Sequence, residues 1–319
     1  MPKVRAYGAD ATLKACREVS YGTAPLTGYQ SLDFKSTDLS SVIPLDDDPL
    51  LGRGRNAQDP YRGLVTDEGQ IEIPFDLRGT GFWLTALFGD PVTTDNGDDT
   101  YTHVWDSGAD HIPSYTLEIG HPKLTTPTFF RHTGARVESL SFDMGQEGPA
   151  NARLQLVAQG EERFAATVDT DPSAYTLRRF SQGRGFIRRG GAVLAGVTEA
   201  SLTVSNNLER VRVIRDDGRI EAADPTLASA DGAISVRFDG ATLVDEAANG
   251  DPVALEYGFS TAQGHELRFD LARVFLPKPK YALSGPGGVQ ADFDWRAAFD
   301  ATERFMLRAH LTNDVPRYA

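Results

Sequence analysis

An eight-residue pattern occurs twice in this chain, once at residues 69–76 (GQIEIPFD) and once at residues 232–239 (GAISVRFD). A stretch typical of a short helix follows each copy and ends in Gly-Asp-Pro-Val, at residues 89–92 and 250–253. Weaker matches in the same order pair residues 31–34 with 201–204, and parts of 142–156 with parts of 293–307. Because these matches keep one order, they indicate a β-rich domain made twice, and a duplicated domain suggests a ring or an array.

Local patterns predict strands with one short helix in each half. Ile71, Ile73 and Phe75 alternate after the first repeated glycine, so they are expected on one face of a strand. The run 82–88 (FWLTALF) has the spacing of a short helix, and Gly89 is a plausible stop. We therefore predict a mainly β fold of two tandem sandwich-like or barrel-like domains, each with one short flanking helix and a long charged loop.

Domain boundaries follow from the same repeat. The predicted parts of the chain are a first domain with an N-terminal arm at 1–165, a linker at 166–190, and a second domain with a C-terminal tail at 191–319. The second half is expected to carry a shorter helix near 241–248, and its tail is expected from residue 313 onwards. Residues 44–63 and 206–230 are charged, rich in turns and without a core-building period, which is typical of exposed loops.

The chain is acidic, with a net charge of −13 and a pI of about 4.9. Broad binding to a nucleic-acid backbone needs clustered Lys and Arg, so this composition argues against it. A like-charged wall could still enclose DNA without retaining it. No apolar run approaches the roughly 18 residues of a membrane helix, and no secretory signal follows the basic N-terminus, so synthesis and folding in a cytoplasm are expected.

Motifs for catalysis or metal binding are missing from the sequence. His103, His111, His121 and His132 fall close together, but they lie on separate predicted strands or turns and are better explained as scattered structural residues. The acidic runs lack the register of a calcium loop, and no phosphate loop or nucleophile elbow is present. Cys16, the single cysteine, is expected to be a small apolar thiol. We therefore predict neither an enzyme nor a cofactor or metal site.

One basic cluster stands out in this acidic chain. It consists of Arg178, Arg179, Arg184, Arg188 and Arg189. Arginine suits protein interfaces, so these residues are predicted to meet acidic loops of the same protein or of its neighbour rather than nucleic acid.

Two further segments resemble a known family. Residues 18–25 (EVSYGTAP) and 205–209 (SNNLE), together with the Gly-x-Ile-x-Ile-x-Phe pattern and its helix, resemble the tail tube (major tail) proteins of long-tailed bacteriophages. The resemblance extends over most of the chain, roughly residues 10–312. The order of several weak motifs carries it, rather than any single specific one.

The resemblance implies a structural virion protein of the phage tail. Each tube domain would contribute an inner sheet to a closed barrel, and stacked rings would form a tube that conducts genomic DNA without binding it specifically. With two domains in one chain, three chains would form a pseudo-hexameric homotrimer ring. Expected partners are the tape measure, tail terminator and tail tip proteins, with no membrane, and assembly would take place in the cytoplasm of the bacterial host. The absence of an extra outer domain favours a non-contractile siphophage tail.

Candidate surfaces follow from this interpretation. Contacts with the adjacent ring are expected from the two charged loops, at Asp46, Asp47, Asp48, Arg53, Arg55, Asp216, Asp217 and Arg219. Carboxylates that face the channel are expected at Glu72, Asp143, Asp292 and Asp294. The arginine cluster is expected at an interface between subunits.

Other readings of the sequence remain open. A tandem β-sandwich module for binding or adhesion, to a carbohydrate or a receptor, would carry an aromatic or calcium cluster at one loop end. A β-sandwich hydrolase would need an acid/base pair or a nucleophile in a cleft. A minor tail or connector protein with the same fold differs from the tube in copy number, which sequence does not report.

Overall fold

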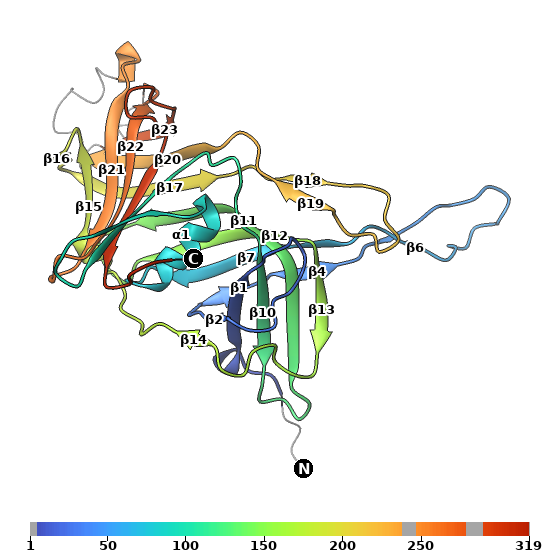
Figure 1. Ribbon diagram of the computed structural model, residues 1–319. Helices are drawn as coiled ribbons and strands as arrows, with labels where there is room; N and C mark the ends of the chain where they lie inside the picture. Colours follow the sequence, from blue (N-terminus) through green and yellow to red (C-terminus); the bar gives the residue numbers. More distant parts are fainter. Residues whose placement is uncertain (1–4, 238–246, 279–289, 319) are drawn as a thin grey trace.

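The computed structural model describes residues 5–237, 247–278 and 290–318, and it confirms the prediction of a mainly β protein (Figure 1). Twenty strands are linked by hydrogen bonds into one system of sheets, and the described residues form no closed barrel. Two hairpins stand apart from it: β5 (Leu45–Asp46) with β6 (Tyr61–Arg62), and β18 (Glu209–Val211) with β19 (Ala222–Asp224). The named helical segments are η1 (Gly8–Asp10), α1 (Gly79–Phe88) and η2 (Gln182–Arg184), and residues 247–249 are also helical.

The central sheet contains strands from both halves of the sequence. In spatial order they are β7 (Thr66–Pro74), β12 (Asn151–Ala158), β11 (Thr128–Met144), β17 (Val197–Ser205), β20 (Ser229–Arg237) and β23 (Gln290–Ala297). The short strands β3 (Ser36–Thr37) and β4 (Ser40–Val42) pair with β7 at one edge. All of these pairs are antiparallel.

Two smaller sheets flank the central sheet. The second sheet runs β16 (Ala192–Val193), β15 (Gly185–Arg189), β21 (Val253–Ser260), β22 (Glu266–Phe275), β24 (Arg308–Asn313), β9 (Tyr101–Asp106) and β8 (Val92–Asp95). The third sheet contains β14 (Ser173–Ala174), β2 (Gln30–Ser31), β1 (Thr12–Arg17), β10 (Tyr115–His121), the first part of β11, and β13 (Gly160–Phe164). Strand β11 is long enough to take part in both the third and the central sheet.

Among the described strands, pairing joins the two halves of the chain in two places. Strand β11 pairs with β17 from Ser139↔Ser205 to Met144↔Ala200, which joins the halves within the central sheet. Strand β24, near the C-terminus, pairs along its whole length with β9 of the first half. The segment predicted as a linker supplies β14, η2 and β15, so it adds strands to the second and third sheets.

The core lies between the central and second sheets, around α1. All ten residues of this helix are buried, and it begins at Gly79, three residues before the predicted run. The predicted stop is confirmed, because Gly89 has φ +93° and its N–H donates to the Thr85 carbonyl at 2.9 Å. The rings of Phe75 and Phe142 lie 5.2 Å apart in an edge-to-face pair, and Phe75 lies 5.8 Å from Phe259 of the second half.

The alternation predicted in β7 is confirmed, and the repeated glycine has a steric reason. Ile71 and Ile73 are buried in the core. A Cβ at Gly69 would collide with the backbone of Leu39, and a Cβ at Gly232 would collide with the carbonyl of Ser201. The first residue of the repeated pattern therefore lacks a side chain because neighbouring backbone approaches it closely.

One sequence match does not correspond to equivalent strands. Strand β12 pairs with β7 (Leu154↔Ile71), and β23 pairs with β20 in the same way (Phe293↔Ile234). Residues 304–307, which the sequence match set beside 153–156, form the irregular segment before β24. Because β12 and β23 each pair with the strand that carries the repeated pattern, they are the equivalent strands of the two halves.

The C-terminal segment is not the tail expected from sequence. Asn313 and Tyr318 are buried, with Tyr318 only 7% exposed, and the Tyr318 ring packs 4.8 Å from that of His103. Polar residues and a proline at 313–319 suggested a solvated end, but one buried aromatic anchors this segment against α1. The predicted helix near 241–248 lies largely outside the described residues.

Candidate functional site

One face of the central sheet is polar from edge to edge. The pairing register sets Glu72 beside Arg153, and then Ser141, Thr203 and Asp231 follow across the sheet. The opposite face of the same strands carries buried core residues such as Leu154, Leu140 and Leu202. We call the exposed side the polar face.

The four acidic residues predicted to line a channel all lie on the polar face. Lys35 Nζ lies 2.5 Å from Glu72 Oε1, and this hydrogen bond lowers the pKa of the Glu72 carboxyl. Arg153 Nη1 lies 3.1 Å from Asp143 Oδ2. In the second half, Asp292 accepts a hydrogen bond from the Ser235 hydroxyl at 2.6 Å, and Asp294 is exposed. The first two carboxylates are thus partnered by cations within the chain.

The structure adds residues to this face that the sequence analysis missed. Glu199 and Asp231 are exposed there, together with Arg237 and Arg296. Alternation along β17 and β20 is the sequence pattern that could have predicted these residues. Leu202, Val204 and Ile234 are buried on one face of the sheet, and the residues between them lie on the other face. Carboxylates still outnumber cationic groups on the polar face.

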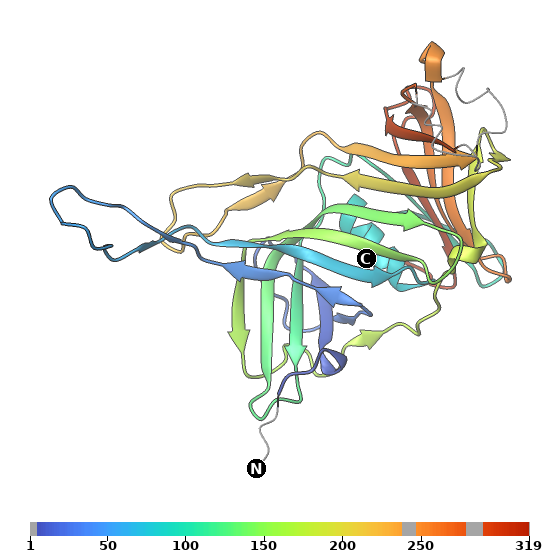
Figure 2. The same ribbon diagram turned by 180° about the vertical axis from the view of Figure 1, so that it is seen from behind.

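The first charged loop forms a hairpin that projects from the body of the protein (Figure 1, right). We call residues 43–62 the arm; its base is the β5–β6 pairing. The predicted contact residues in this loop are all exposed: Asp46, Asp47, Asp48, Arg53 and Arg55. Figure 2 shows the arm extending past the end of the central sheet, beside the β18–β19 hairpin.

The second charged loop is held more closely to its own chain. Arg219 Nη2 lies 3.3 Å from Glu162 Oε1, and Arg215 Nη2 lies 2.6 Å from Asp217 Oδ2. Asp216 is exposed beside them. The Val65 N–H donates to the Gly218 carbonyl at 3.0 Å, which joins this loop to the chain just after the arm. Both predicted contact loops therefore lie at the same end of the central sheet.

A salt-bridged arginine fixes the β18–β19 hairpin. Arg210 lies between two carboxylates, with Nη2 2.9 Å from Glu68 Oε2 and Nη1 2.6 Å from Glu138 Oε1. The hydrogen bonds to Glu138 and Glu68 raise the pKa of the Arg210 guanidinium above its ordinary value. Beneath the hairpin, Leu208 and Val157 belong to a small apolar cluster. The hairpin is thereby attached to the end of the central sheet.

The arginine cluster does not form one patch. Arg188 lies over the Phe186 ring and 3.2 Å from Glu256, and Arg179 donates to the Asn151 amide oxygen at 2.8 Å. Arg189 is half-buried on β15. Arg178 and Arg184 have exposed side chains, Arg184 at the end of η2.

The histidines do not converge. His103 is buried and contacts Thr93 Oγ1 (2.8 Å) and the Val315 carbonyl (2.9 Å), and burial lowers its pKa. His132 is buried against Asp67 at 3.0 Å. Over the described ranges no cluster of three or more His, Cys, Asp or Glu side chains is placed to hold a metal ion. Burial, and the nearby Asp169 and Glu18, raise the pKa of the Cys16 thiol, which disfavours the thiolate.

The motif at residues 18–25 has a structural explanation. The Glu18 carboxylate is 8% exposed and accepts four hydrogen bonds of 2.7–2.8 Å. The donors are the Ser114 and Thr116 hydroxyls and the backbone N–H groups of Gly22 and Gly134. The motif therefore fixes a turn at the end of the third sheet.

The structure thus combines a central sheet shared by both halves, one polar face of that sheet and a projecting arm. The chain matches the family model of phage tail tube proteins over residues 8–297, and it belongs to this family. No curated protein matches the chain. The family is structural rather than catalytic, and membership makes the chain a bacteriophage virion component that self-assembles into a tube with other tail proteins. None of the helices in the described ranges has the length and apolar character that a membrane crossing requires.

Proposed function

We propose that three copies of this chain form a ring in which the central sheets continue from one chain to the next. The ring encloses a channel lined by the polar face. The rings stack into a non-contractile tail tube through which genomic DNA passes, between a tail terminator at one end and a tail tip at the other, with a tape measure protein inside during assembly. The single observation that carries this proposal is the six-strand central sheet with one polar and one buried face.

The edges of the central sheet support closure into a ring. In the described part of the chain, β23 pairs with β20 along its length but with β22 only at Arg296 and Ala297. The opposite edge consists of the short strands β3 and β4. Open strand edges are templates for pairing with another chain. Pairing β23 with the β3–β4 edge of the next copy satisfies both edges.

The polar face suits DNA in transit. Glu199, Asp231, Asp292 and Asp294 are exposed, and Ser, Thr and Gln side chains fill much of the remaining surface. A wall with excess negative charge repels a polyanion weakly, so DNA is not retained on it. The cations at Lys35 and Arg153 neutralise Glu72 and Asp143 locally, so the second half provides most of the repulsion.

End-on electron microscopy of the purified protein at rising concentration tests this proposal. Hollow rings with pseudo-sixfold outline and a mass of three chains per ring are expected, with stacks at higher concentration. Six chains per ring would contradict the trimer. Monomers that form no ring at any concentration, even with a tail-tip complex added as a nucleus, would contradict the tube.

Neutralising two carboxylates on the second-half part of the polar face is expected to slow DNA delivery. Phage carrying Asp292→Asn with Asp294→Asn should form intact tubes but deliver DNA about tenfold less efficiently, because the wall loses charge that keeps DNA from adhering. Potassium efflux or DNA release from particles triggered in vitro measures the rate. The matched control is Asp99→Asn with Asp110→Asn, two exposed carboxylates outside the central sheet. Unchanged delivery by the first pair would refute a channel role for these residues.

A further inference from the structure

The tip of the arm carries large apolar side chains that its own chain leaves uncovered. Leu50 is 55% exposed, and Leu51 is completely exposed. Leu45, near the arm's base, is also exposed. Apolar side chains gathered on a projecting hairpin mark a surface that a partner buries.

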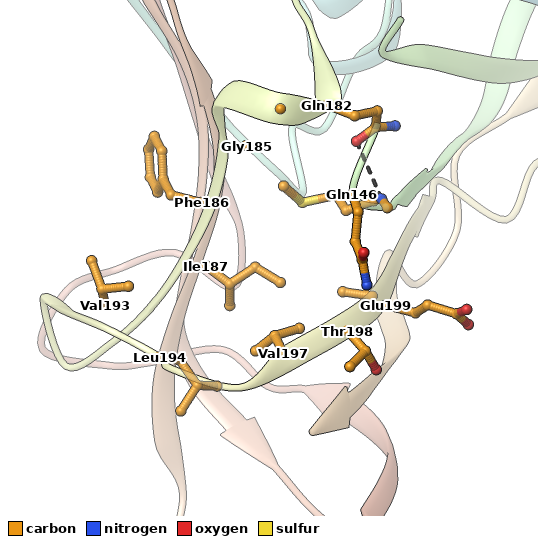
Figure 3. Close-up of a pocket in the computed structure, with 14 residues that line it drawn as sticks. Gln146, Gln182, Gly185, Phe186, Ile187, Val193, Leu194, Val197, Thr198 and Glu199 are labelled. Atoms are coloured by element: carbon orange, nitrogen blue, oxygen red, sulfur yellow. Dashed lines mark hydrogen bonds between the residues drawn. The ribbon is translucent and has the colours of Figure 1, made fainter. Parts of the chain in front are cut away.

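A groove with apolar walls lies where β11 ends and β17 begins. It has a volume of about 380 Å³, and its apolar lining includes Met144, Phe186, Ile187, Leu194 and Val197. Figure 3 shows Ile187 and Val197 pointing into the space between β15 and β17, with Gln146 and Gln182 on the far side. The Gly145 N–H donates to Gln182 Oε1 at 3.3 Å, which ties η2 to the end of β11.

The arm and the groove lie at opposite ends of the central sheet. Strand β17 begins at the groove with Val197 and ends at Ser205, just before the β18–β19 hairpin beside the arm. Strand β7 begins beside the arm, and β11 ends at the groove with Met144. Nine residues of extended chain span about 30 Å. The two surfaces therefore cannot meet within one chain.

Complementary charges accompany the apolar surfaces. Arg53 and Arg55 follow the leucines at the tip of the arm. Glu199 lines the groove, and it also lines the adjoining depression with Asp143. Arg184 is exposed on η2 beside the groove, opposite in sign to the acidic run 46–48 at the base of the arm. When the tip of the arm lies in the groove, its two arginines therefore face Glu199, and the acidic run at its base faces Arg184.

We propose that the arm of one copy inserts Leu50 and Leu51 into this groove of a second copy in the neighbouring ring. A contact between two different surfaces at opposite ends of a molecule does not close on itself, so it propagates as an open stack. The contact seats Arg53 and Arg55 next to Glu199. This inference rests on the proposed function, because it identifies the receptor for an arm that stacks one ring on the next.

Cysteine crosslinking of assembled tubes tests the contact directly. In a Cys16→Ser background, Leu51→Cys combined with Gln146→Cys is expected to give a ladder of covalent multimers under oxidation. Both positions are exposed, so folding should be preserved. Disulfides form only when the two Cα atoms come within about 7 Å. The control pair, Leu51→Cys with Val19→Cys at an exposed position in the turn after β1, should give no ladder. Tubes without a ladder from the first pair would overturn the proposal.

A charged substitution separates this contact from ring closure. Leu51→Asp is expected to leave single rings intact while raising the concentration needed for stacking at least tenfold, which corresponds to about 1.4 kcal/mol for each ring-to-ring association. Glu199→Arg should weaken stacking in the same direction, and adding Arg53→Glu with Arg55→Glu should restore it. Rings that stack normally with Leu51→Asp would refute the arm contact alone. Failure of the unsubstituted protein to form rings would refute the proposed function instead.

Discussion

Replacing Glu18 with alanine is expected to lower the free energy of unfolding by about 3 kcal/mol or more. Each carboxylate oxygen accepts one backbone N–H and one hydroxyl: Gly22 and Ser114 at Oε2, and Gly134 and Thr116 at Oε1. The hydroxyls can turn to other acceptors. The two N–H groups would remain without partners, and a buried donor without a partner costs about 1–3 kcal/mol. Denaturant unfolding of the two proteins measures the difference.

The isosteric variant Glu18→Gln is the matched control for this prediction. It keeps one carbonyl oxygen but sets an NH₂ group against one of the two backbone N–H donors. We expect Glu18→Gln to lower the free energy of unfolding by less than Glu18→Ala does. The Glu18→Ala change should also speed amide exchange in the turn at Gly22 and at the β1–β10 end of the third sheet. A loss below 1 kcal/mol for Glu18→Ala would show that the carboxylate is not the structural centre of this motif.

Replacing Tyr318 with alanine is expected to cost about 3–5 kcal/mol, the range for removing a large buried aromatic side chain. Its ring lies 4.8 Å from that of His103 and 6.1 Å from that of Trp105. Its hydroxyl donates to the Arg78 carbonyl at 2.7 Å and accepts from Asn313 Nδ2 at 2.6 Å. Burial raises the pKa of this phenol well above its ordinary value, so it stays protonated and continues to donate.

Two variants separate the contributions at this position. Tyr318→Phe keeps the ring and removes the hydroxyl, so a loss of about 1–2 kcal/mol is expected from the buried Arg78 carbonyl and Asn313 amide. Gly81→Ala should destabilise the same contact from the other side, because a Cβ there would collide with the Tyr318 ring. Thermal and denaturant unfolding measure both. A change under 0.5 kcal/mol for Tyr318→Ala would mean that the C-terminal segment behaves as the tail predicted from sequence.

The candidate residues on the central sheet were predictable from sequence to a limited extent. Asp292 and Asp294 alternate with Phe293 and Trp295, so the sequence alone separated the polar from the buried side of that strand. That Asp143 lies on the same face depends on register across several strands. The pairing of Asp143 with Arg153 likewise depends on strand pairing, which local pattern does not report.

The sequence by itself determined the mainly β class, the buried side of each patterned strand, the helix after β7, and the family. The first three properties depend on residues within a few positions of each other, because alternation and turn residues act over that range. The family followed instead from the order of several motifs along the chain. Only the tertiary structure decided that β11 joins β17 and that β24 joins β9. It also decided that Tyr318 is buried and that the arm and the groove lie at opposite ends of one sheet. These features depend on contacts between residues far apart in the chain, and their free energy comes from burial that no short segment achieves alone.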